Sequence, residues 1–295
     1  MIIKLGRRLN IRQVALATAE IYLTRFLTRV LLKEINVYVL VTTCLYVSCK
    51  IEECPQHIRL IISEARNLWP EYIPHDVTKL AEFEFYLIEE MDLFLFLHHP
   101  YKSLIQIRDF LSKNVAIYGF SLTDEELQNS WSLINDSYIT DLHLLLPPHI
   151  IAVAAVYITI VLKKHLSRGN NGSGNDPGKD GAMHIDDLMT LANPAGQGGA
   201  HSVGGASTSS SVHTNAATTT DTTSDTNLET THFQDMKVDE DTVKINKFMN
   251  FLDHLHINLD EVVEAMQDMI NVYVVWNRYN EGGVKRALQM MLLSR

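Results

Sequence analysis

The sequence VYVLVTTCLYVSCKI, residues Val37 to Ile51, is apolar on every side of a helical projection until Lys50. A helix that is apolar all round lies inside a bundle, with other helices packed about it. Its β-branched residues would also suit a buried strand, but such strands usually run for about 4–8 residues, so the length favours a helix. A membrane span would need about 20 apolar residues, and Glu52 and Glu53 follow here at once. The stretch therefore predicts the core helix of a helical domain.

A second apolar stretch, Ile150 to Leu162, repeats this arrangement later in the chain. In both places an amphipathic helix, a tight turn and an all-apolar helix follow one another. Tyr22 aligns with Tyr138, and Tyr46 aligns with Tyr157. A supersecondary unit that occurs twice indicates two related domains. The sequence therefore predicts an all-α fold of two helical bundles in tandem.

Helical periodicity and capping signals place the remaining helices. Asn10 is the expected N-cap of the second segment, and Thr123 opens a capping box with Glu126. The predicted segments, after a helix end at Met1 to Leu9, are Ile11–Leu32, Asn36–Ile51, His57–Leu68, Pro74–Met91, Pro100–Ser112, Thr123–Leu146, Ile150–Lys164, Val243–Leu255 and Leu259–Asn280.

The stretch 167–242 breaks this pattern. It is rich in Gly, Ser and Thr, and between Ser167 and Asp241 it holds eleven acidic and three basic residues. Such a composition buries too little apolar surface to offset the entropy lost on ordering. We expect a disordered insert that interrupts the second bundle. Its glycines follow no strand and carry no GK[ST], so a phosphate loop is not indicated.

Composition excludes several classes of function. The net charge of −10 lies mostly in the insert, so the helical part is close to neutral. A nucleic-acid binder would usually show a basic face, and neither apolar run is long enough for a membrane span. Cys44, Cys49 and Cys54 are spaced by five residues, off a common helical face and without a zinc-type pair. We interpret them as reduced, buried thiols of a reducing compartment.

No catalytic or metal constellation is apparent in the sequence. It contains neither HExxH nor GxSxG, the spacings that metalloproteases and α/β-hydrolases require. His254 and His256 point to different faces of a helix. We expect no enzyme activity, no metal and no cofactor.

One carboxylate stands out on the segment from Pro74 to Met91. On a helical wheel of about 100° per residue, Glu84 lies in the middle of a stripe formed by Val77, Leu80, Ala81, Leu87, Ile88 and Met91. A charge within a core-facing stripe needs a partner, and Lys50 at the end of the core helix is the candidate. The equivalent position in the repeat is Val161, so the fold alone does not demand the charge. In the alternative interpretation, Lys50 only faces the helix dipole and Glu84 tilts to solvent.

Several of these stretches resemble a known family. ATAEIYLTRF, CLYVSCKIEE and FEFYLIEEMD are similar, in order and spacing, to the first box of the cyclins. HHPY (98–101), WSLINDSYITDLHLLLPPHIIAVA (131–154) and ECPQHIR (53–59) resemble the cyclin C type, and SEARNLWPEYIP (63–74) resembles its fungal form. The resemblance covers the whole helical part of the chain.

The resemblance implies a fold and a function. It implies a first cyclin box over 1–95, a second box over 96–166 plus 243–293, and the disordered insert over 167–242. Cyclins are regulatory subunits without activity of their own, and they bind and activate a cyclin-dependent protein kinase. The family's kinase-contacting lysine and glutamate match Lys50 and Glu84.

The cyclin C type further implies a set of partners. These are the kinase and other subunits of the Mediator kinase module, with RNA polymerase II holoenzyme as an indirect partner and no direct contact to nucleic acid or membrane. The implied place is the nucleus. The implied role is regulation of RNA polymerase II transcription, including phosphorylation of the polymerase's C-terminal repeat domain.

The sequence departs from the family pattern in two places. The aspartate that many cell-cycle cyclins carry in Y-x-D-R-F is Thr24 here. Family members usually carry more helix before LGRRLNIRQ, so we expect an N-terminally truncated first box that lacks one packing face. Two other interpretations stay open: a cyclin-fold promoter-binding factor of the general transcription factor IIB type, and a helical adaptor without a kinase.

Overall fold

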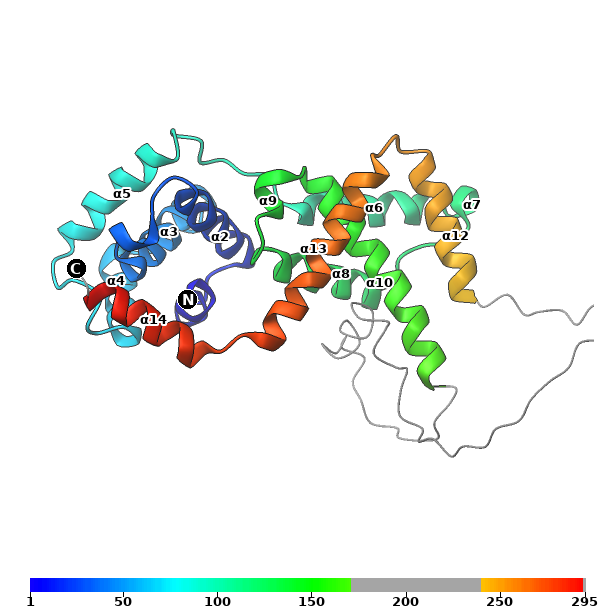
Figure 1. The fold of residues 1–295 in the computed structure, drawn as a ribbon. Helices are drawn as coiled ribbons and strands as arrows, with labels where there is room; N and C mark the ends of the chain where they lie inside the picture. The colour runs from blue at the N-terminus through cyan, green and yellow to red at the C-terminus, as the bar shows by residue number, and fades with distance from the viewer. Residues whose placement is uncertain (171–239, 294–295) are drawn as a thin grey trace, which may run out of the picture.

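The computed structural model describes residues 1–170 and 240–293, and these two ranges contain helices and turns but no strand. The helices form two bundles that lie side by side (Figure 1), which confirms the predicted all-α class. Most of the predicted insert over 167–242 lies outside the described residues. At its ends, α10 (Pro148–Asn170) and α12 (Glu240–Asp253) extend into it.

The first bundle is built around α3 (Val37–Ile51), as its apolar sequence predicts. The side chain of Asn36 caps this helix by accepting hydrogen bonds from the backbone N–H groups of Tyr38 and Val39. Most of the α3 side chains are buried. The helices packed around α3 are α1 (Ile2–Arg8), α2 (Gln13–Leu27), α4 (Ile58–Leu68) and α5 (Thr78–Glu90).

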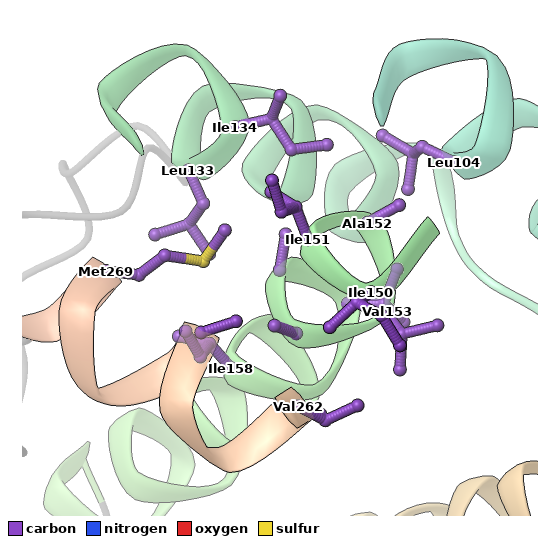
Figure 2. Packing of buried hydrophobic residues seen from close by; sticks show 14 of the residues in the cluster. Leu104, Leu133, Ile134, Ile150, Ile151, Ala152, Val153, Ile158, Val262 and Met269 are labelled. Atoms are coloured by element: carbon purple, nitrogen blue, oxygen red, sulfur yellow. The ribbon is translucent and has the colours of Figure 1, made fainter. Parts of the chain in front are cut away.

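The second bundle repeats this plan around α10. Ile150, Ile151, Ala152 and Val153 of this helix are all buried, and Figure 2 shows them among side chains of the surrounding helices. The helices around α10 are α6 (Pro100–Lys113), α8 (Asp124–Ser137), α9 (Leu142–Leu145), α12 and α13 (Leu259–Arg278). The short helix α7 (Val115–Tyr118) packs on α12.

The last helix, α14 (Glu281–Leu293), was not predicted as a separate helix. It runs back from α13 along the first bundle (Figure 1). There Leu288 and Leu292 pack against the core of that bundle, and Lys4 pairs with Glu281 at 2.5 Å. The chain segment that the sequence assigns to the second box thus covers part of the first. The domain boundaries themselves stay a prediction.

Two predicted helix boundaries are wrong near the start of the chain. Asn10 is not an N-cap: its φ is 51°, in the left-handed region, and α2 starts only at Gln13. At the other end α2 stops at Leu27, where a turn and the short 3-10 helix η1 (Leu32–Glu34) replace the predicted continuation. The apolar residues after Leu27 carry no signal for this turn, so periodicity extended the helix too far.

The predicted helix from Thr123 to Leu146 is in fact two helices. Its capping box is confirmed, with Thr123 and Glu126 bonded reciprocally. The helix ends at Ser137, where hydroxyl groups bond the backbone: Ser137 Oγ donates to the carbonyl of Ile134, and Thr140 Oγ1 donates to that of Ser137. Such bonds compete with helix propagation. A short turn therefore separates α8 from α9.

Glu126 also ties three helices of the second bundle together. Lys244 Nζ, from α12, donates to both carboxylate oxygens at 2.7 Å, and Lys163 Nζ, from α10, lies 3.7 Å away. The Glu126 side chain is only 2% exposed. Burial alone would raise its pKa, but Lys244, the Thr123 amide and Lys163 outweigh burial, so the pKa lies below its usual value. The carboxylate is therefore held in its charged form.

A polar node built on Thr18 joins the two bundles. The buried Thr18 hydroxyl donates to Glu52 Oε1 at 2.6 Å, just after α3, and lies 2.8 Å from His99 Nε2, in the segment between the bundles. His99 Nδ1 lies 2.8 Å from the Tyr138 hydroxyl at the end of α8. Because the single Thr18 proton goes to Glu52, His99 donates from Nε2 and accepts from Tyr138. Burial is the main cause that lowers the His99 pKa, which fits this neutral form.

We predict that Glu126→Gln destabilises the second bundle by about 3 kcal/mol, because it leaves two lysines facing a neutral side chain. Urea unfolding at pH 7 measures the loss. Since the folded pKa is depressed, the contribution of Glu126 is complete above its unfolded pKa of about 4.3 and disappears as the pH falls through the folded value. The free energy of unfolding of the Glu126→Gln variant should lack this part of the pH dependence.

The control is Glu125→Gln, which removes the neighbouring, exposed carboxylate and should change stability by less than about 0.5 kcal/mol. Equal effects of the two substitutions would contradict the role given to Glu126.

For the Thr18 node we predict that Thr18→Val costs about 1–3 kcal/mol, because Glu52 and His99 then lose a buried partner at nearly constant shape. Urea unfolding measures the cost. The matched control is Thr24→Val on the same helix, where the hydroxyl bonds only the backbone carbonyl of Glu20. A Thr18→Val effect no larger than that of Thr24→Val would show that the node does not join the bundles.

Candidate functional site

Lys50 and Glu84 form an ion pair between α3 and α5. Lys50 lies in the last turn of α3, and Glu84 lies on α5 between the buried Leu80 and Leu87. Their Nζ and Oε1 atoms are 2.6 Å apart. The pairing predicted from the helical wheel is therefore confirmed, and the alternative in which the two charges do not meet is wrong. The role of the pair in binding stays a prediction.

The pair sits at the rim of the bundle and is open to solvent. The Lys50 side chain is 41% exposed and that of Glu84 is 14% exposed. Lys50 Nζ also lies 4.3 Å from the centre of the Tyr46 ring, a cation–π contact. Partial burial alone would lower the Lys50 pKa, but Glu84 and Tyr46 outweigh it, so the pKa lies above its usual value. The ammonium group is charged, oriented and accessible to a partner.

This ion pair is not needed to hold the fold together. The ammonium group of Lys50 is screened by solvent, which limits what the pair contributes to stability. The equivalent position in α10 is occupied by Val161, and α10 is as well packed as α3. The repeat therefore forms its core helix without this charge.

Large apolar side chains are exposed next to this pair in the sequence. Phe85, which follows Glu84 on α5, is 74% exposed, and Phe96, beyond the end of α5, is 85% exposed. Leu93 and Phe94 between them are also exposed. These four exposed apolar side chains fall within twelve residues of one another in the sequence.

Arg25, in the last turn of α2, and Arg29, in the turn after that helix, hold the segment that carries these residues, and sequence reasoning missed both. Arg25 donates to the carbonyls of Phe94 at 2.9 Å and Met91 at 3.0 Å. Arg29 donates to the carbonyl of Glu90 and pairs with Asp92. Because α2 ends between the two arginines, helical spacing gives no signal for this contact. The exposed segment is thus fixed to the first bundle.

Neither the histidines nor the acidic residues form a metal centre in the part of the chain that the structure describes, where no three His, Cys, Asp or Glu side chains converge. His99 belongs to the Thr18 node, and His143 stacks on Tyr138 with ring centres 3.7 Å apart. Over residues 1–170 and 240–293, none of the helices combines the length and the apolar character that crossing a membrane requires.

Comparison with known proteins identifies relatives of this chain. The model of the family "Cyclin, N-terminal domain" matches residues 1–93. A Scheffersomyces stipitis protein named RNA polymerase II holoenzyme cyclin-like subunit is 72% identical over 308 residues, which cover 100% of this chain and 82% of that protein. Proteins of the same name from Debaryomyces hansenii and Saccharomyces cerevisiae are 63% and 42% identical, over 100% and 99% of this chain and 82% and 73% of their own lengths.

Identity at this level over almost the whole chain agrees with the two bundles, each built around an apolar helix. The chain belongs to the cyclin family and, within it, to the cyclin C type.

Proposed function

We propose that this chain is the regulatory subunit of a cyclin-dependent protein kinase, which it binds and activates through the first bundle. The observation that carries the proposal is the accessible Lys50–Glu84 pair, held at the end of a core helix. In the cyclins that the chain resembles, a lysine and a glutamate at these positions contact the kinase.

The rigidity of α3 suits this role. Its buried side chains leave the helix no room to move within the bundle. Its C-terminal end is further held by Glu52, which accepts the hydrogen bond from Thr18. A kinase is activated when its αC helix moves inward and completes a Lys–Glu ion pair. A rigid surface that binds only the inward form selects that conformer and so shifts the kinase to the active state.

The chemistry around the ion pair suits a protein partner. Lys50 and Glu84 offer a donor and an acceptor that are already oriented toward each other, so little side-chain entropy is lost when a kinase backbone or side chain binds them. Phe85, the next residue on α5, is 74% exposed and offers an apolar side chain on the same helix. An aromatic anchor beside a few oriented polar groups is the usual composition of a binding hot spot.

The names of the relatives and the resemblance to cyclin C support a proposal for the wider assembly. Proteins that share 42–72% identity with this chain are named RNA polymerase II holoenzyme cyclin-like subunits. We extend this to the present chain: the kinase is that of the Mediator kinase module, the complex acts in the nucleus, and it regulates RNA polymerase II transcription. Phosphorylation of the polymerase's C-terminal repeat domain is part of this proposal.

We predict that Lys50→Ala combined with Glu84→Ala abolishes co-purification of the kinase and leaves the helical fold intact. The loss in binding free energy should be about 2–4 kcal/mol, the range typical of a hot spot. Co-expression with the cyclin-dependent kinase of the Mediator module, followed by affinity purification, measures binding. Phosphorylation of a polymerase repeat peptide measures activation, and circular dichroism measures helix content.

The matched control is Lys79→Ala combined with Glu82→Ala, which removes another Lys–Glu pair of α5 at 2.7 Å. These side chains are 56% and 62% exposed and lie on the other side of the helix wheel. Binding and activation should be unchanged in this variant. Full kinase binding by the Lys50/Glu84 variant would remove the pair from the mechanism.

A further inference from the structure

The turn that ends α3 has the left-handed residue and the 6→1 hydrogen bond, from Cys54 N–H to the Cys49 carbonyl, that a Schellman motif shows. The N–H of Glu52 bonds the carbonyl of Ser48 at 2.9 Å, and the N–H of Cys54 bonds that of Cys49 at 2.9 Å. Between them, Glu53 has a φ of 52°, the left-handed conformation that this motif requires at its C′ position. Arg12 donates to the carbonyl of Glu53 and holds the turn to α2. The chain therefore folds back on the last turn of α3.

This motif brings the side chain of the residue after the left-handed position against the third residue from the helix end. Here these two residues are Cys54 and Cys49, whose backbones are joined by the hydrogen bond described above. Cys49 is buried, and Cys54 is partly exposed. Cys44, one turn earlier in the helix, is also buried. The spacing of five suggested that the cysteines do not meet, but that rule holds only within a helix, and α3 ends at Ile51.

We propose that Cys49 and Cys54 form a redox-sensitive dithiol, which a hydroperoxide oxidises to an intrachain disulfide across the C-terminal turn of α3. A disulfide needs Cα atoms about 4.4–6.8 Å apart, and the backbone hydrogen bond between the two residues keeps them close. Disulfides in reducing compartments are usually transient and redox-sensing. The inference rests on the turn alone and does not require the proposed kinase role.

The reaction balances with the hydroperoxide as the only oxidant. The Cys54 thiol releases its proton, and the thiolate attacks the terminal oxygen. The O–O bond breaks, Cys54 becomes a sulfenic acid, and the departing alkoxide or hydroxide takes up that proton and leaves as an alcohol or water. The sulfur of Cys49 then attacks that of Cys54. The S–O bond breaks, and the hydroxide takes up the proton from Cys49 and leaves as water. The sulfurs together lose two electrons, and the peroxide gains them.

The different surroundings of the two thiols set the order of these steps. Burial, with a smaller effect of Cys54, raises the pKa of Cys49 to about 12. Cys49 is therefore protonated and shielded, and an oxidant in solution reaches Cys54 first. Cys49, held across the turn by the backbone hydrogen bond to Cys54, then supplies the second thiol. The disulfide would bracket Glu52, the partner of Thr18, and lie directly beside Lys50.

The test is oxidation of the purified full chain with hydrogen peroxide, followed by alkylation of free thiols and trypsin digestion. Trypsin cuts between Lys50 and Ile51, so the disulfide links the peptides Glu34–Lys50 and Ile51–Arg59. We expect this linked species, with one alkylated cysteine at Cys44, and its loss on reduction. It should form at least about tenfold faster in the folded chain than in guanidinium, because the fold positions the second thiol.

Two variants separate the possible outcomes. Cys54→Ser should abolish the link, whereas Cys44→Ala should leave it unchanged. Loss of the link in Cys44→Ala would show that Cys44, and not Cys49, bonds Cys54, and would overturn the proposal. Irreversible oxidation of Cys54 without a link, unmodified thiols, or an equal rate in guanidinium would each overturn it as well. Kinase binding is not measured, so failure here leaves the proposed function standing.

Discussion

The all-round burial of α3 is the constraint on which the rest of the structure depends. A helix with apolar side chains on every face is stable only when neighbours cover all of it, and α1, α2, α4 and α5 do so. The same requirement at α10 produces the second bundle. Two helices that cannot face water thus dictate the number of bundles and the place of most other helices.

The same burial explains why the candidate site lies at a helix end. The body of α3 has no surface to offer, so a polar residue on it reaches solvent only where the core stops, at Lys50. Glu84 meets it from α5 at the same rim. The segment after α5 is fixed by Arg25 and Arg29. Charges and exposed aromatic residues are thereby carried by a rigid scaffold, which lowers the entropy lost on binding.

The two bundles are not independent units. The hydroxyl of Thr18 connects the end of α3 with His99 and, through it, with Tyr138 of the second bundle. From the other direction, α14 brings Leu288 and Leu292 back to the first core. The end of α3 carries Lys50 and the turn between Cys49 and Cys54, and it is therefore linked to both bundles. A structural change in this turn acts on the contacts that join the two bundles.

Local periodicity by itself determined the all-α class, both core helices and the capping box at Thr123, because each depends on residues within one or two turns and on which helix face must be buried. It also placed Glu84 in a core-facing stripe and named Lys50 as its candidate partner, but the packing of α5 on α3 decided that the two charges meet. Only the tertiary structure decided where α2 and α8 stop, where α14 packs, how Thr18 meets His99, and that Cys54 lies against Cys49. These features depend on hydrogen bonds and packing between residues distant in sequence, or on a single left-handed residue, and neither leaves a periodic signal.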